Sequence, residues 1–120
     1  MRTLRETKGT ILLTSSGAAV KGTATWGAYN ASKAVLNSLA RTIAAEESDV
    51  TVLSIRPGVV DTEMQNTLRD EHYSKMEKED VDRFVEMRAQ GKMLKPEQPG
   101  NVMARLVLQK PSSMNGEFLR

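Results

Sequence analysis

The stretch TILLTSS, residues 10–16, decides the fold class of this chain. It follows Gly9, it is apolar and rich in branched side chains, and it ends in two serines. Such short apolar runs are typical of parallel strands that are buried on both faces. A second run, VTVLSI at residues 50–55, stops just before Pro57, which lacks a backbone donor, and a glycine that permits a turn. The sequence therefore predicts two parallel strands.

The residues between the two runs predict one long helix. Apolar side chains recur there every three or four residues, and acidic residues mark the exit of the helix toward solvent. The apolar positions are Ala34, Leu36, Leu39, Ala40, Ile43 and Ala44. A helix of this length between two parallel strands is the right-handed crossover of an open sheet with helices on its faces. We therefore predict an α/β fold with a doubly wound parallel sheet.

The rest of the chain predicts an insertion, a second helix and the start of a third strand. Residues 62–92 are highly charged and offer only short helical stretches, such as 81–87, so we interpret them as a lid over a substrate site. Pro96 supplies a helix-start signal, and that helix should end near Lys110. Residues 116–119 begin a third strand. Residues 1–120 are thus interpreted as a single domain.

The composition argues against several classes of function. The 120 residues are 39% hydrophobic and 27% charged, which fits one small soluble domain. The net charge of +2 is scattered along the chain, so no nucleic-acid partner is indicated. Cysteine is absent, His72 has no second metal ligand nearby, and no apolar run reaches the roughly 18 residues of a membrane span. We therefore expect a cytoplasmic protein without a metal site or a membrane segment.

Tyr29 and Lys33 form the first candidate functional pair. They lie one helical turn apart within AYNASKA, residues 28–34, in the middle of what we expect to be a buried helix of small residues. Ser16 lies thirteen residues before Tyr29, at the carboxyl end of the first predicted strand, where open α/β sheets bind their ligands. The alternatives are an ordinary surface pair for Tyr29 and Lys33, and a plain end-of-strand turn for Ser16.

The motifs TSSGAA, YNASK and RPGVVDT, in this order, resemble the short-chain dehydrogenase/reductase family of the compact type. The resemblance runs through nearly the whole chain: a strand that ends in the catalytic serine, a helix with the tyrosine and the lysine, and a strand that ends in Pro-Gly. Sugar-nucleotide epimerases share the tyrosine and lysine but hold their serine or threonine farther upstream, so the spacing argues for the compact type. Residues 94–120 resemble, more loosely, fungal carbonyl reductases related to sepiapterin reductase.

This resemblance implies an NADP(H)-dependent oxidoreductase that acts on a small carbonyl or alcohol compound. Tyr29 would protonate the carbonyl oxygen as hydride arrives, or act as the base in alcohol oxidation. A free phenol has a pKa of about 10 and is a poor base at pH 7, but a cation one turn away favours the phenolate. Lys33 would also bind the nicotinamide ribose, and Ser16 would hydrogen-bond the substrate oxygen.

The resemblance also assigns part of the cofactor site. Pro57, Gly58, Val60 and Thr62 match the segment of the family that lines the nicotinamide, where backbone groups hold the carboxamide. The pyrophosphate of the family binds a glycine-rich turn after the first strand, and no Gly-x-x-x-Gly-x-Gly pattern follows a strand here. The residue that selects NADP over NAD is also missing, so NAD stays open. Residues 1–120 therefore look like the carboxyl-terminal half of such an enzyme. By this resemblance they form a single, partial domain of the dinucleotide-binding, Rossmann type, with an incomplete doubly wound parallel sheet.

Three functional hypotheses follow. The first is an oxidoreductase whose glycine-rich half lies outside this chain and which, as in the family, forms a homo-oligomer through the Tyr29 helix. The second is a catalytically inactive remnant that binds a partner through the open edge of the predicted sheet. The third, which the serine spacing argues against, is a sugar-nucleotide epimerase. Because an open apolar edge promotes aggregation, we expect the isolated chain to be poorly soluble or partly unfolded.

Overall fold

The computed structural model describes residues 1–120 and contains one parallel sheet of three strands. The strands β1 (Thr10–Thr14), β2 (Thr51–Ile55) and β3 (Phe118–Leu119) lie in the order β1-β2-β3. In the register of β1 and β2, Thr10 lies opposite Thr51 and Thr14 lies opposite Ile55. The predicted parallel strands, including the short third one, are therefore confirmed.

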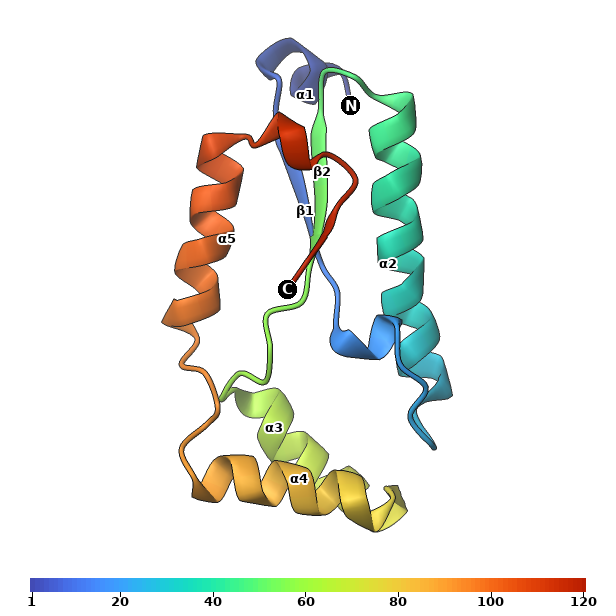
Figure 1. Ribbon diagram of the computed structural model, residues 1–120, viewed down its shortest axis with the longest axis vertical. Helices are drawn as coiled ribbons and strands as arrows, with labels where there is room; N and C mark the ends of the chain where they lie inside the picture. The colour runs from blue at the N-terminus through green and yellow to red at the C-terminus, as the bar shows by residue number, and fades with distance from the viewer.

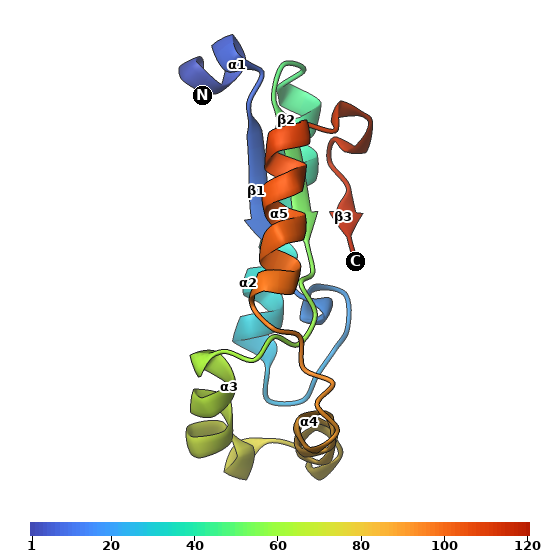
Figure 2. The ribbon, with the colours of Figure 1, turned by 90° about the vertical axis from the view of Figure 1, so that its left-hand side faces the viewer.

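Two helices cover the two faces of this sheet. The crossover helix α2 (Gly27–Glu46) packs on one face, and α5 (Glu97–Gln109) packs on the other, which gives three layers (Figure 1 and Figure 2). Both helices agree with the sequence prediction, because α5 begins just after Pro96 and ends at Gln109, next to Lys110. The predicted α/β class of fold is thus confirmed. None of the helices is both long and apolar enough to cross a membrane.

The two long strands differ in burial. Every residue of β2 is buried, because β2 has a strand on each side and a helix on each face. The prediction that the strand of residues 10–16 is buried on both faces is wrong, since the residues of β1 are partly exposed and Thr14 is exposed. β1 is an edge strand that pairs only with β2, so water reaches its free side.

The crossover helix is buried along only one stripe. Ala40 packs with Val50 and Val52 in the hydrophobic core, and Asn37 is the other buried residue of α2. The expectation of a buried helix with Tyr29 at its middle is therefore wrong. Tyr29 lies in the first turn, and the face of α2 that points away from the sheet is exposed.

A short helix at the amino end, α1 (Arg2–Thr7), has no counterpart among the predictions. Its sequence is polar, but Leu4 packs against the core and the backbone N–H of Gly9 donates to the Leu4 carbonyl over 2.8 Å. Arg5 forms a bidentate ion pair with Glu47 beyond the end of α2, with Nε 2.7 Å from Oε2. These contacts hold α1 on the body of the protein.

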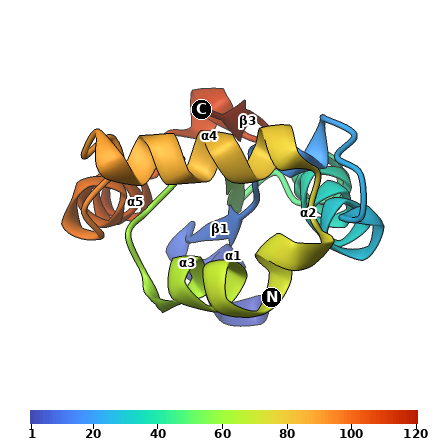
Figure 3. The ribbon, with the colours of Figure 1, turned by 90° about the horizontal axis from the view of Figure 1, so that it is seen from below.

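Residues 63–89, which we call the arm, lie beyond the carboxyl ends of β1 and β2 (Figure 1 and Figure 3). The arm consists of α3 (Glu63–Thr67), a π-helical turn η2 (Leu68–His72), a 3-10 turn η3 (Tyr73–Lys75) and α4 (Lys78–Ala89). Its second helix is longer than the predicted stretch 81–87. The role of the arm as a substrate lid stays a prediction.

Candidate active site

The site predicted from the sequence lies at the carboxyl ends of β1 and β2. Ser16 follows β1 and Gly58 follows β2, and because the strands are parallel both residues lie at the same end of the sheet. Both line a cleft of about 670 Å³ that extends from this end of the sheet to α4 of the arm. The structure therefore places these two predicted residues in one cleft.

Ser16 is held by the turn that it begins. It caps the 3-10 helix η1 (Gly17–Ala19), and its Oγ accepts a hydrogen bond from the Ala18 backbone N–H over 3.2 Å. No protein acceptor receives the hydroxyl hydrogen of Ser16, so that hydrogen is free to bind a ligand. The arrangement suits a donor to a substrate oxygen.

Tyr29 and Lys33 lie in the first two turns of α2, and Lys33 ties that helix to the end of β1. Its Nζ donates to the Thr14 carbonyl over 3.0 Å, and its own carbonyl accepts from Ser15 Oγ over 3.2 Å. Its ammonium lies 5.6 Å from the centroid of the Tyr29 ring. The structure thus brings the predicted pair together and anchors it to the strand that ends in Ser16.

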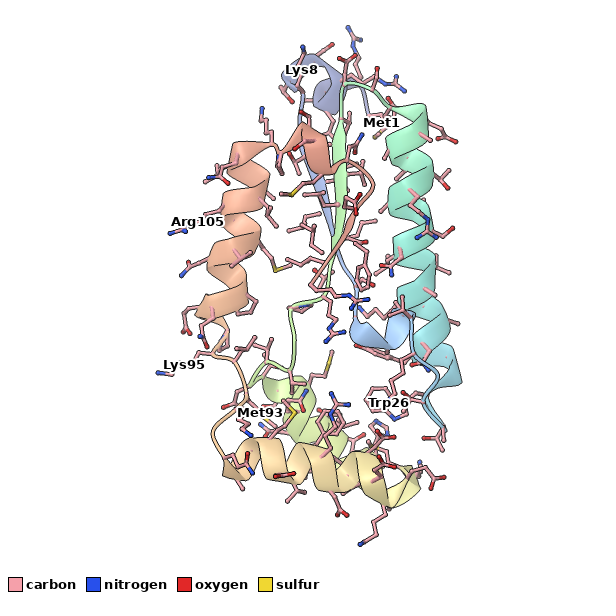
Figure 4. The ribbon with its side chains drawn as sticks, in the orientation of Figure 1. Met1, Lys8, Trp26, Met93, Lys95 and Arg105 are labelled. Atoms are coloured by element: carbon pink, nitrogen blue, oxygen red, sulfur yellow. The ribbon has the colours of Figure 1, made fainter.

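Trp26 connects this pair to the arm. Its ring meets the Tyr29 ring edge to face at 5.5 Å between centroids, and it stacks on Phe84 of α4 at 6.1 Å with an angle of 9° between the rings. Figure 4 shows Trp26 between the beginning of α2 and the arm. Trp26 and Phe84 line the cleft, whereas Tyr29 and Lys33 do not.

The segment after β2 presents free backbone donors. The N–H groups of Gly58, Val59 and Val60 donate to no protein acceptor, while the Val59 carbonyl accepts from Leu94 N over 2.8 Å. Gly58 has φ of +89°, a conformation that favours glycine. The free N–H groups after Pro57 can therefore donate hydrogen bonds to the oxygen of a carboxamide. Thr62 does not line the cleft. It is exposed directly before α3, and its Oγ1 donates a hydrogen bond to the Val60 carbonyl over 3.4 Å.

These groups fit the nicotinamide end of a dinucleotide. Lys33 uses one of its three N–H bonds on Thr14, which leaves two for ribose hydroxyls, and the free N–H groups after Pro57 suit the carboxamide. The turn after β1 does not fit a pyrophosphate, because it leads into a 3-10 helix of three residues and the Ala18 N–H is already bound to Ser16. No cluster of three or more His, Asp or Glu side chains is placed to hold a metal ion.

Several residues of the cleft are not among the predicted site residues. Arg56 follows β2 directly, and its guanidinium lies against Gly17, so close that a methyl group on Gly17 would lie 3.1 Å from Nη1. Its place at the carboxyl end of a buried strand is the signal that identified Ser16, and it could have found Arg56 as well. Phe84, Arg83 and Lys92 reach the cleft through the packing of the arm, for which the sequence gives no signal.

Comparisons with known proteins bear on this geometry. A family model described as short chain dehydrogenase matches residues 1–73. An uncharacterised oxidoreductase of Schizosaccharomyces pombe is 38% identical over 117 residues, which cover 97% of this chain and 47% of the relative. A benzil reductase ((S)-benzoin forming) of Saccharomyces cerevisiae is 44% identical over 116 residues, which cover 93% of this chain and 44% of the relative.

Among solved structures, that of the KRED1-Pglu enzyme superposes with a TM-score of 0.92. The two sequences are 40% identical, and the match covers 96% of this chain and 48% of that one. The chain therefore spans about half the length of the curated relatives and of the solved structure that it matches.

Proposed function

Because the chain belongs to the short-chain dehydrogenase/reductase family of oxidoreductases, we propose that it carries the catalytic residues for NADP(H)-dependent reduction of a small carbonyl compound. One observation supports this most: Lys33 is bound to the end of β1 one turn from Tyr29, at the strand end where Ser16 has an unused hydroxyl hydrogen. The predicted family resemblance is confirmed, and the epimerase alternative is set aside.

The proposed chemistry divides between cofactor and protein. The reduced nicotinamide, when bound, supplies a hydride to the carbonyl carbon. Tyr29 donates its hydroxyl proton to the carbonyl oxygen, which becomes the alcohol, and the ammonium of Lys33 stabilises the phenolate that remains. Ser16 donates a hydrogen bond to the same oxygen and holds the carbonyl in place before transfer. The phenolate then takes a proton from solvent.

The cofactor contacts proposed for this chain concern the nicotinamide end alone. Lys33 would bind the ribose hydroxyls, and the backbone between Pro57 and Val60 would bind the carboxamide, with Thr62 beside it. Members of this family bind nicotinamide cofactors. We propose NADP rather than NAD from the resemblance to carbonyl reductases, with NAD as the alternative. A glycine-rich half must be supplied for the pyrophosphate to bind.

We also propose that the arm is a substrate lid and that the exposed face of α2 joins two copies of the enzyme in a homo-oligomer. The arm borders the cleft, and Ala28, Ala31, Val35 and Leu39 expose small and apolar groups along α2. The alternative of an inactive remnant predicts that none of the three catalytic side chains matters for any activity. A cytoplasmic location remains a prediction from the sequence.

A chimera tests the proposal directly. In it, this chain replaces the matching segment of the benzil reductase of Saccharomyces cerevisiae, which supplies the rest of the enzyme. We expect the chimera to oxidise NADPH when benzil is present, and Tyr29→Phe to lower kcat about 100- to 10,000-fold. The matched control is Tyr73→Phe, which removes the other phenol of the chain and should leave kcat unchanged. Full activity of the Tyr29→Phe chimera would refute the proposal.

A further inference from the structure

The cleft beside Ser16 has a strongly basic lining. Four cationic side chains contribute to it, from the loop before α2, the end of β2, the arm and the segment after the arm. They are Lys21, Arg56, Arg83 and Lys92. A single carboxylate, that of Asp80, lies among them. Arg120 also lines the cleft. The excess of positive charge in the cleft is thus larger than that of the whole chain, whose net charge is +2.

None of the four cations pairs with a carboxylate, although Arg83 lies over the Phe84 ring, with Cζ 5.8 Å from the ring centroid. The four ion pairs of the structure all lie elsewhere, on Arg2, Arg5, Arg69 and Lys78. The side chains of Lys21, Arg56, Arg83 and Lys92 also donate no hydrogen bond to protein acceptors. Unpaired charges of one sign around a concave site focus the electrostatic potential there and attract a ligand of the opposite sign.

Arg56 is the cation closest to the chemistry. Its guanidinium packs on Gly17, the residue next to Ser16, while Ser16 has a hydroxyl hydrogen to offer a carbonyl oxygen. A planar guanidinium binds a carboxylate through two parallel hydrogen bonds, which fixes the orientation of the ligand as well as its charge. A ligand with a carboxylate next to its carbonyl group would engage both residues at once.

The apolar part of the same cleft constrains the rest of the ligand. Trp26 and Phe84 stack on each other at one side of it, and Met87 and Leu94 add apolar surface. An aromatic or branched apolar group would fill this part with favourable contact. The cleft thus combines an apolar wall with a basic one.

From these observations we infer that the cleft selects an anionic carbonyl substrate, a 2-oxo acid with an apolar side chain, whose carboxylate binds Arg56. The inference rests on the proposed reductase activity and specifies its substrate class. Tyr29 does not line the cleft itself, but its ring contacts Trp26 at the border of the cleft, with 5.5 Å between the ring centroids. The reaction balances as in the neutral case: the hydride reaches the keto carbon, the proton of Tyr29 reaches the keto oxygen, and the product is a 2-hydroxy acid. The carboxylate is unchanged and takes no part in the electron transfer.

The test uses two substrates that share one phenyl ketone and differ in charge. Benzoylformate carries the carboxylate, and methyl benzoylformate presents the same phenyl ketone as a neutral ester. In the chimera described above, we expect kcat/KM for the acid to exceed that for the ester about tenfold. Arg56→Gln should lower kcat/KM for the acid about 10- to 100-fold, because a charge-assisted hydrogen bond is lost, and should change the ester less than threefold.

Arg105→Gln is the matched control. Arg105 is exposed on α5 and points away from the sheet (Figure 4), so its loss should change neither substrate. Added salt should lower kcat/KM for the acid but not for the ester, because salt screens the attraction between the carboxylate and the cations of the cleft. The inference is overturned if kcat/KM for the ester equals that for the acid, or if Arg56→Gln lowers kcat/KM for both substrates by the same factor. An effect of Arg56→Gln on the KM for NADPH alone would likewise overturn it and assign the arginine to the cofactor.

A binding measurement separates failure of this inference from failure of the proposed function. If neither substrate nor benzil is reduced, the reductase proposal fails, and calorimetry with the two expected products, mandelate and methyl mandelate, decides the inference independently. Tighter binding of mandelate that Arg56→Gln abolishes would support an anion site in the cleft. Equal binding of the two, or binding of mandelate that survives Arg56→Gln, would overturn it.

Discussion

The body of the protein, made of the sheet with α2 and α5, and the arm are built in different ways. Of the eleven buried residues, ten lie in the body or in its connections, and Phe84 alone lies in the arm. The body holds Ser16, Tyr29 and Lys33 through strand ends and helix turns, whereas the arm reaches the same cleft through one aromatic stack on Trp26. The difference suggests that the body supplies fixed chemistry and the arm supplies adjustable contact.

The ion pairs repeat this contrast. Arg5 of α1 and Glu47, the residue after α2, are 42 residues apart in sequence, so their pair joins α1 to the body. Arg69 and Asp70 of the arm are adjacent in sequence, so their pair joins nothing distant. The long-range ion pair therefore lies outside the arm, whereas both ion pairs of the arm, Arg69–Asp70 and Lys78–Asp82, are local.

The largest expected effect comes from the core of the body. Leu53 of β2 is fully buried, so Leu53→Ala should lower the free energy of unfolding by about 2–5 kcal/mol through lost burial and a cavity. Urea denaturation of the chimera, followed by circular dichroism, measures this loss. Leu108→Ala is the matched control, because Leu108 is 79% exposed, and it should change the free energy of unfolding by less than about 0.5 kcal/mol. Similar losses for both variants would contradict this description of the core.

The next effect concerns the attachment of the arm. Phe84→Ala removes the stack on Trp26, so the amide hydrogens of residues 63–89 should exchange faster while those of β2 keep their protection. Hydrogen exchange with mass spectrometry reads both regions in one sample. Val85→Ala, at an exposed neighbour on the same helix, should leave the pattern unchanged. Faster exchange in β2 would show that the arm and the body unfold as one unit.

Two glycines with positive φ extend the comparison. Gly58, with φ of +89°, follows β2, and a methyl group there would lie 3.0 Å from Leu94 Cδ1. Gly58→Ala should lower the global free energy of unfolding by about 1–2 kcal/mol, the cost of a left-handed residue. Gly91, with φ of +60°, follows the arm in open space. Gly91→Ala introduces similar backbone strain, but it should lower the stability of the arm alone. If Gly58→Ala and Gly91→Ala lowered the global free energy of unfolding equally in urea denaturation, the proposed difference between the body and the arm would be contradicted.

The smallest effect is pH-dependent and belongs to the Arg5–Glu47 pair. The hydrogen bond from Arg5 lowers the pKa of Glu47 below its ordinary value of 4.5. A lowered pKa in the folded state means that the carboxylate stabilises the fold above pH 4.5 and loses this contribution as the pH falls through the lowered pKa. Glu47→Gln should therefore lower the melting temperature slightly at pH 7 and leave it unchanged once the carboxylate of the parent is protonated.

Asp70→Asn is the control from the arm. The hydrogen bond from Arg69 also lowers the pKa of Asp70, but the two residues are adjacent and their pair joins no separate elements. We expect no shift in the melting temperature of the body at either pH. A larger shift in the melting temperature for Asp70→Asn than for Glu47→Gln would contradict the expectation that the long-range ion pair stabilises the protein more than the local pair of the arm.

The elements that the sequence predicted are those with strong local patterns. The continuous apolar run of β2 and the helical periodicity of α2 require no knowledge of distant partners, and both were predicted. The polar helix α1 was missed because its stability comes from Leu4 on the core and from Arg5 on Glu47. The exposure of β1 was also missed, since it depends on which strands are present beside it.

The candidate site divides in the same way. Ser16, Lys33 and Gly58 stand in ordered motifs at strand ends and helix turns, so their placement at one end of the sheet followed from the sequence. Phe84 and the cationic side chains of the arm reach the cleft only because the arm folds back toward the sheet. No local pattern encodes that approach, and the substrate preference proposed above depends on it in part.

The most direct test of the account is the separation of kcat from KM in the chimera, with benzil as substrate and NADPH in excess. The account predicts that Tyr29→Phe lowers kcat at least about 100-fold, because the body supplies the proton. It predicts that Phe84→Ala mainly raises KM, because the arm supplies contact. A Phe84→Ala enzyme with a collapsed kcat and an unchanged KM, or a Tyr29→Phe enzyme with the kcat of the parent, would contradict it.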